Sequence, residues 1–230
     1  NVLYAITPGK GKSAINFIVS KYNPDTQDLL FLLIPDELKV VDHDNGAGVT
    51  TLGNYYADRG AKKAAEYLSA LFSSDIPCYA AIPYDTLNTL IGKFGTLPVE
   101  LPMPIRYVDT DSEQIDYAND INYEKGDVAL TGKAAVNLLK FANDPGAYFG
   151  KDIVDYYNTK NAQAIRSAFS DELAYVMLQG FVQNNFTPEN QDKMASNFET
   201  LLSLSEGNIS ESILQGMTHD LGKVSAEKTE

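Results

Sequence analysis

Residue types that commonly carry chemistry are scarce in this sequence of 230 residues. It has one cysteine, Cys78, which excludes an internal disulfide and a cysteine-rich metal site. Cys78 lies in the apolar run IPCYAAI, so we expect a small, buried core residue. His43 and His219 are the only histidines, and without partners at ligand spacing they indicate neither a catalytic dyad nor a zinc site.

Positive charge is also scarce. Only three arginines occur, Arg59, Arg106 and Arg166, which is few for a protein that grips phosphate. Acidic residues outnumber basic ones by 31 to 18, and the net charge is −13. Because such a surface repels phosphate backbones, we expect no nucleic-acid partner.

Long hydrophobic runs are absent as well. No stretch reaches the roughly 18 apolar residues that a membrane-spanning helix requires. The apolar share of 44% is nevertheless typical of a globular protein that can bury a core.

A continuous apolar stretch, LLFLLI, spans residues 29–34, ends at Pro35 and is followed at once by Asp36 and Glu37. A short continuous run of this kind predicts a central strand buried on both faces. In α/β proteins, ligands commonly bind at the carboxyl ends of such strands. The simpler alternative is a strand exit with two solvated acids.

The rest of the chain alternates between strand and helix patterns. Residues 2–6 and 14–22 read as strands, and the turn NPDTQD predicts an antiparallel hairpin between the second strand and residues 29–34. Apolar spacings of three and four predict helices over 61–72, 84–94, 133–142, 170–186, about 188–205, and a short one after Ser210. The fold class is therefore α/β, with a central mixed sheet flanked by helices and a helical C-terminal flank. We expect a single domain over residues 1–224 and a frayed tail over 225–230.

Two kinds of loop resemble known sites without matching them. TPGKGKS follows a strand, but a P-loop needs a glycine where Ile6 stands, and a strand rather than a helix comes next. Lys10, Lys12 and Ser13 either contact an anion or form an exposed turn. DHDNG and DTDSE lack the spacing of an EF-hand, and we expect solvated turns there.

Four segments, taken in order, resemble the LytR-CpsA-Psr family of cell-envelope proteins. They are NVLYAI, NPDTQDLLFLLIPDE, LGNYYADRGAKKAAEYLSALFSSDIPCYAAI and KGDVALTGKAAVNLLKFANDPGAYFGK. The resemblance implies an α-β-α domain at the outer face of the membrane of a Gram-positive bacterium, anchored by a segment that precedes Asn1. It also implies transfer of a glycopolymer from a polyprenyl-diphosphate carrier to peptidoglycan, with arginines and Mg²⁺-binding aspartates holding the diphosphate.

The charged positions depart from the family pattern. The arginine of the Ile-Pro-Arg-Asp motif falls on Asp36, and its aspartate falls on Glu37. The family's aspartate before the second strand falls near Ile15, and Lys12 or Ser13 stands where an arginine is usual. An aspartate in place of an arginine at a diphosphate grip inverts the charge and weakens anion binding.

Lysines and arginines also occur at or near other family motif positions, but they do not reproduce the family's motifs. Arg59 and Gly60 correspond to the glycines at a helix start. Lys140 and Lys151 lie around the arginine-rich strip, and Arg166 best matches a late arginine. With Lys12 and Ser13, these residues are the predicted ligand-binding set.

Two main hypotheses follow. In the first, the protein binds a polyprenyl-linked envelope glycopolymer, peptidoglycan or a partner protein, with the diphosphate clamp largely lost. In the second, it is an active phosphotransferase with a clamp rebuilt from Lys12, Lys140, Lys151 and Arg166. Asp36 and Glu37 would then be the catalytic residues and the Mg²⁺ ligands. A purely structural extracellular module would explain the acidity but not the retained architecture.

Overall fold

The computed structural model describes residues 1–9, 14–43, 46, 48–106, 121–144, 146–185, 187 and 190–221. The chain divides into two compact units, which we treat separately. Unit 1 comprises Asn1–Leu90 and Asn185–Glu230, and unit 2 comprises Ile91–Asn184. The single domain predicted for residues 1–224 stays a prediction, and the expected frayed tail lies outside the described residues.

Unit 1 is built on a five-stranded mixed sheet with the order β11-β6-β1-β2-β3. The strands are β1 (Val2–Thr7), β2 (Asn16–Asn23), β3 (Asp28–Pro35), β6 (Cys78–Pro83) and β11 (Glu206–Gly207). Strand β1 pairs antiparallel with β2 and parallel with β6, and β2 pairs antiparallel with β3. The predicted hairpin and the predicted mixed sheet are confirmed, and Cys78 is buried as expected.

The position predicted for residues 29–34 was wrong. Strand β3 is the edge strand of the sheet in the part of the chain that the structure describes. Leu30 and Leu32 are 43% and 41% exposed, whereas Leu29 and Ile34 are buried. An unbroken apolar run fits both a central strand and an edge strand with exposed leucines, because the run itself carries no information about neighbours.

One long helix covers one face of this sheet. Helix α1 (Leu52–Phe72) begins at the N-cap Thr51, whose hydroxyl accepts a hydrogen bond from the backbone N–H of Asn54 at 3.2 Å. A kink interrupts it at Gly60, where φ is +78°, a value that favours glycine. We predicted only the part after the kink. The buried side of α1 packs on β1 and β2 in one hydrophobic core that includes Leu3, Phe17, Leu52, Tyr56, Ala64 and Leu68.

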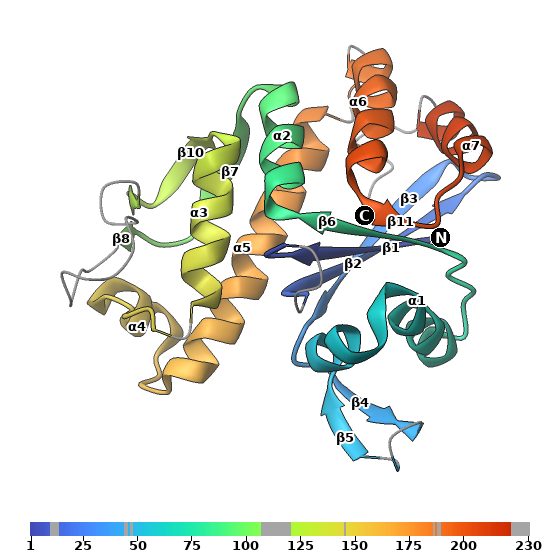
Figure 1. Ribbon diagram of the computed structural model, residues 1–230. Helices are drawn as coiled ribbons and strands as arrows, with labels where there is room; N and C mark the ends of the chain where they lie inside the picture. The colour runs from blue at the N-terminus through green and yellow to red at the C-terminus, as the bar shows by residue number, and fades with distance from the viewer. Residues whose placement is uncertain are drawn as a thin grey trace. The chain divides into compact units, whose positions relative to one another are not determined.

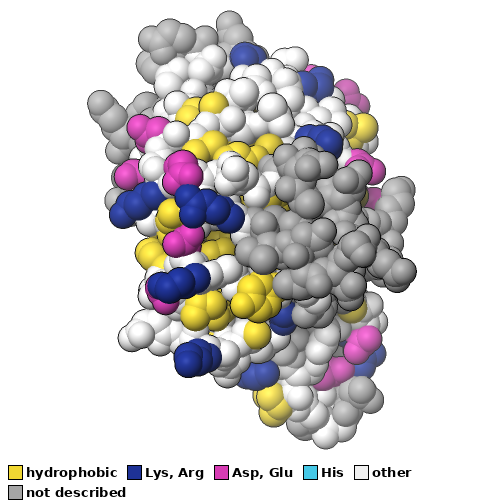
Figure 2. Space-filling model, turned by 90° about the vertical axis from the view of Figure 1, so that its left-hand side faces the viewer, with side chains coloured by type: hydrophobic (Ala, Val, Ile, Leu, Met, Phe, Trp, Pro, Cys, Tyr) yellow, Lys and Arg dark blue, Asp and Glu magenta, His cyan; other side chains and the backbone are white. Residues whose placement is uncertain are grey.

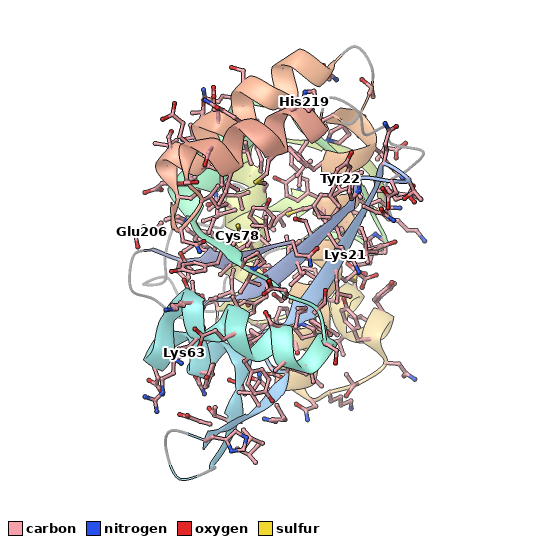
Figure 3. All side chains as sticks on the ribbon, turned by 90° about the vertical axis from the view of Figure 1, so that its right-hand side faces the viewer. Lys21, Tyr22, Lys63, Cys78, Glu206 and His219 are labelled. Carbon is pink, nitrogen blue, oxygen red and sulfur yellow. The ribbon has the colours of Figure 1, made fainter. Side chains whose placement is uncertain are left out.

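The remaining elements of unit 1 complete its layers. Helices α6 (Gln191–Leu204) and α7 (Glu211–Leu221) lie on the side of the sheet opposite α1, as Figures 1 and 3 show. A small hairpin of β4 (Lys39–Asp42) and β5 (Gly48–Thr51) leads into α1. The sheet is therefore flanked by helices, as predicted. Helix α2 (Tyr84–Phe94) spans the boundary at Leu90.

Unit 2 combines short strand pairs with three helices. Strand β7 (Leu97–Leu101) pairs with β10 (Gly126–Leu130), and β8 (Ile105–Arg106) pairs with β9 (Asn122–Tyr123). The helices are α3 (Gly132–Asn143), α4 (Lys151–Tyr157) and α5 (Ala162–Asn185). Phe141, Phe149 and Phe169 form a buried edge-to-face trio with ring centroids 5.6–6.0 Å apart. In the described residues of either unit, no helix is both long enough and apolar enough to span a membrane.

Candidate functional site

The end of β3 runs directly against the beginning of α1. The backbone N–H of Gly53, in the first turn of the helix, donates to the carbonyl oxygen of Asp36 at 2.8 Å. The N–H of Leu52 donates to the carbonyl oxygen of Leu38, also at 2.8 Å. These two bonds use N–H groups that a helix start leaves without intrahelical partners. They fix the turn that follows Pro35 to the N-terminus of α1.

The side chain of Asp36 packs against the same helical turn. A Cβ added to Gly53 would lie 3.3 Å from Cβ of Asp36, 3.4 Å from its Oδ2 and 3.2 Å from the carbonyl oxygen of Ala14. Gly53 therefore permits the close approach of this carboxylate. Because the N-terminus of a helix attracts anions, Asp36 occupies a place where a phosphate would otherwise be favoured.

Glu37 follows Asp36 at this corner, whereas Asn16 projects from the other face of the sheet, because its neighbour Phe17 packs in the core under α1. Glu37 is exposed, next to the half-buried Asp36. Asn16 begins β2 directly opposite Pro35 and is only 1% exposed. Within the described part of the chain, neither its Oδ1 nor its Nδ2 has a hydrogen-bond partner. A buried amide without partners is costly, so Asn16 marks a polar spot that a ligand could satisfy.

Arg59 forms a salt bridge with Asp42, which lies in the DHDNG segment that we expected to be a solvated turn. Its guanidinium donates from Nη2 to Oδ2 of Asp42 at 3.0 Å, with longer contacts from Nε and Nη2 at 3.4 Å. The Asp42 side chain is 8% exposed and that of Arg59 is 31% exposed. The interpretation of Asp42 as a solvated turn residue was therefore wrong, because β4 carries it under the arginine. The structure brings Arg59 to Asp42.

The predicted cations of unit 2 also have partners of their own. Lys151 pairs with Asp155 one turn along α4, and this hydrogen bond raises the pKa of the lysine. Arg166 donates to the carbonyl oxygen of Asp144 at 3.0 Å and to Oε1 of Gln163 at 2.7 Å. Lys140 is exposed in the last turn of α3.

Charges of both signs are interspersed on the outside of the molecule. Figure 2 shows one face on which dark blue and magenta side chains lie next to one another rather than in one basic patch. Arg106 illustrates this arrangement, since it bonds Glu124 at 2.7 Å and Asp152 at 3.0 Å. Lys12 and Ser13, the remaining members of the predicted ligand-binding set, lie outside the described residues.

A magnesium ion at Asp36 and Glu37 would need phosphate oxygens of a bound substrate to complete its coordination. The described residues contain no group of three or more Asp, Glu, His or Cys side chains placed to hold a metal ion. Mg²⁺ is commonly held by only one or two carboxylates together with substrate phosphates. Asp36 and Glu37 meet that smaller requirement, so their predicted role as Mg²⁺ ligands stays a prediction.

Comparison with protein families gives one match. The model described as the LytR_cpsA_psr family matches residues 11–153, which is more than half of the chain. The chain belongs to the LytR_cpsA_psr family. Membership connects the protein with the cell envelope and its glycopolymers, as the four sequence segments indicated. A search of curated protein sequences found no match.

Solved structures share the fold of this family member. TagV of B. subtilis is 17% identical with a TM-score of 0.70, and the match covers 100% of this chain and 81% of that one. A LytR-Csp2A-Psr enzyme from Actinomyces oris is 16% identical with a TM-score of 0.71, covering 99% and 78%. TagU of B. subtilis is 13% identical with a TM-score of 0.55, covering 100% and 83%. At these identities the likeness shows the fold, and the predicted fold class is confirmed.

Proposed function

We propose that this family member binds a polyprenyl-linked envelope ligand, or a partner, at the corner between β3 and α1, and that the family's diphosphate clamp is largely lost. The position of Asp36 is the observation that carries the proposal. Its carboxylate lies within 3.4 Å of the Cβ position of Gly53, in the first turn of α1. An anion approaching this turn meets a negative charge instead of free N–H groups.

The magnitude of this repulsion favours loss of the clamp. Two unit charges about 4 Å apart interact by about 4 kcal/mol at the effective dielectric typical of a protein surface. Replacing an arginine by an aspartate turns this interaction energy from attractive to repulsive for each nearby phosphate. Arg59 does not offset it, since Asp42 already holds its guanidinium.

Asn16 offers a second polar contact for a ligand, at the start of β2 and on the face of the sheet opposite α1. Its buried amide can both donate and accept hydrogen bonds, and it has no partner among the described residues. A hydroxyl, amide or sugar group of a bound ligand would satisfy it without requiring a positive clamp.

The test has two steps. Mass spectrometry of the purified protein should detect a co-purified polyprenyl lipid. Titration with geranylgeranyl diphosphate should then show weak binding that Mg²⁺ does not strengthen. Asp36→Arg should raise the affinity for this diphosphate by about tenfold or more, the factor that corresponds to roughly 1.4 kcal/mol.

Asp28→Arg is the matched control, because Asp28 is an exposed acid at the other end of the same strand. It changes the net charge equally and should leave the affinity unchanged. If neither a lipid nor the diphosphate is found on the protein, the proposed ligand is wrong.

The same titration distinguishes the alternative function, an active phosphotransferase, from the proposed binding function. An active phosphotransferase with a clamp from Lys12, Lys140, Lys151 and Arg166 requires tight binding of the diphosphate by the unmodified protein. That binding should depend on Mg²⁺, and it should weaken in Asp36→Asn if Asp36 holds the metal. This pattern would overturn the loss of the clamp and favour transfer of a glycopolymer to peptidoglycan.

A further inference from the structure

A hollow in unit 1 lies on the α1 side of the sheet, away from the end of β3. It has a volume of about 370 Å³. The kinked part of α1 lines one side, and the neighbouring strands β6 and β11 of the sheet line the other. Small residues leave the space open: Ala57, Gly60, Ala61, Ala81 and Gly207 all line it. A Cβ added to Gly60 would meet no atom within 4 Å, so the kink opens onto free space.

The strand register directs a carboxylate toward this hollow. Glu206 of β11 lies directly opposite Ala81 of β6. Residues directly opposite each other in an antiparallel pair have their side chains on the same face of the sheet. Tyr79, two residues before Ala81, shares that face and packs against the core that α1 covers. Glu206 therefore projects on the α1 side, and Figure 3 shows it at the edge of the sheet above α1.

The position of β11 is held firmly. Asn208 accepts a hydrogen bond from the N–H of Tyr79 at 2.8 Å, and its side-chain amide donates to the carbonyl oxygen of Pro77 at 2.8 Å. Its backbone N–H donates to the carbonyl oxygen of Tyr79 at 3.2 Å. A Cβ at Gly207 would lie 2.1 Å from that carbonyl oxygen, so only glycine permits this approach. The wall that carries Glu206 is thus fixed against β6.

Tyr56 adds a phenol group to the lining of the hollow. It is 9% exposed, it lines the hollow, and within the described chain its hydroxyl makes no hydrogen bond. Burial first, and then the nearby charge of Glu206, raise the pKa of Tyr56 above its usual value. Glu206 is the one charged residue among those that line the hollow.

We propose that this hollow binds an organic ammonium group. Two tyrosine side chains and one carboxylate line a space with neither Lys nor Arg among its lining residues. Aromatic faces and a carboxylate together are the groups that recognise substituted ammonium ions. The small residues leave room for a head group with several methyl groups, and the net charge of −13 favours the approach of cations.

Calorimetric titration with choline chloride tests this site directly. Dimethylbutanol, the uncharged carbon isostere of choline, has the same shape and should bind at least about tenfold more weakly, as expected for loss of a partly desolvated cation–aromatic and ionic contact. Glu206→Gln should weaken choline binding by a similar factor of about ten. Tyr79→Leu should weaken it as well, because it keeps an apolar side chain but removes an aromatic face.

Glu211→Gln is the matched control. Glu211 is an exposed acid at the start of α7 that does not line the hollow, so this variant should bind choline like the unmodified protein. Equal binding of choline and dimethylbutanol, equal effects of Glu206→Gln and Glu211→Gln, or no binding of choline would each overturn the proposal. Circular dichroism spectra of all three variants establish that they are folded. The result is independent of diphosphate binding at Asp36.

Discussion

Arg59 and Asp42 form a forked salt bridge between α1 and β4 in which the carboxylate is almost fully buried, with Nη2 3.0 Å from Oδ2. It joins the residue before the Gly60 kink to the end of a strand 17 positions earlier. The bridge fixes the first turns of α1 and, with them, the helix N-terminus against which Asp36 packs. It also holds the Arg59 guanidinium in an ion pair within the protein.

Removal of this bridge should destabilise the protein. Arg59→Met keeps most of the aliphatic stem but leaves the Asp42 charge buried without its arginine. Breaking a fully buried pair costs roughly 3–5 kcal/mol, and we expect about 2 kcal/mol here because Arg59 is partly solvated. Urea denaturation followed by circular dichroism measures the free energy of unfolding.

The control for this prediction is an exposed pair on the same helix. Lys62, whose side chain is 72% exposed, lies 3.9 Å from Glu66. Lys62→Met should change the free energy of unfolding by no more than about 0.5 kcal/mol. Equal losses in the two variants would contradict a specific role for burial of Asp42.

Gly180 should not tolerate a side chain. A Cβ at this position in α5 would lie 1.9 Å from the carbonyl oxygen of Pro98 in β7, and that backbone atom has no side-chain freedom to move away. We expect Gly180→Ala to lower the free energy of unfolding by about 2 kcal/mol or more through overpacking. Gly92→Ala in α2 meets open space and should stabilise the protein by up to about 1 kcal/mol. Thermal unfolding of the two variants should therefore shift in opposite directions.

Stability should fall in alkaline solution because of Tyr4. Burial is the main cause that raises the pKa of Tyr4 above 10, the hydrogen bond with Ser20 opposes the shift, and Cys78 adds to it. Above pH 10 the unfolded state loses this proton while the folded state keeps it. The contribution of Tyr4 is therefore complete below pH 10 and decreases as pH rises, by about 1.4 kcal/mol per pH unit.

Tyr4→Phe should make this alkaline decline shallower. The measurement is the free energy of unfolding by urea at several pH values above 10. Ile6→Val removes a methylene from the same buried strand without removing a titrating group, so its curve should keep the unmodified slope. An identical slope in Tyr4→Phe would show that Tyr4 is not a source of the decline.

The amide of Asn16 should serve binding rather than stability. Asn16→Leu removes a buried polar group that has no partner among the described residues, so the ligand-free protein should keep its stability or gain about 1 kcal/mol. Asn143→Leu is the contrast, because Asn143 donates to the carbonyl oxygen of Leu139 and accepts from Ser170. That variant should lose about 1–2 kcal/mol. A comparable loss in Asn16→Leu would contradict a ligand role for this amide.

Apolar spacing, turn residues and helix caps predicted the helices and strands whose formation depends on residues close together in the sequence. The hairpin between β2 and β3, helix α2 and the helix after Thr131 lie close to where spacing, turn residues and caps placed them. Family membership followed from the order of four segments. The two turns of α1 before Gly60 were missed, since LGNYYADR has weak apolar periodicity and the kink shifts its phase.

Short-range sequence patterns did not predict contacts between residues that are far apart in the sequence. The sequence shows Asp36 and Glu37 at a strand exit, but only the packing of β3 against α1 places the Asp36 carboxylate at Gly53. The burial of Asp42 depends on β4 meeting α1, and no neighbour of Asp42 in the chain signals it.

The sequence by itself determined the α/β class, the family, the acidic composition and the two acids that follow Pro35. Each of these depends on residue identity, order or short-range periodicity. The tertiary structure decided that β3 lies at the sheet edge, that Arg59 is bound by Asp42, and that Glu206 faces Tyr56 across a hollow. These relationships depend on strand order and register, which arise when distant segments pack together and bury their apolar faces.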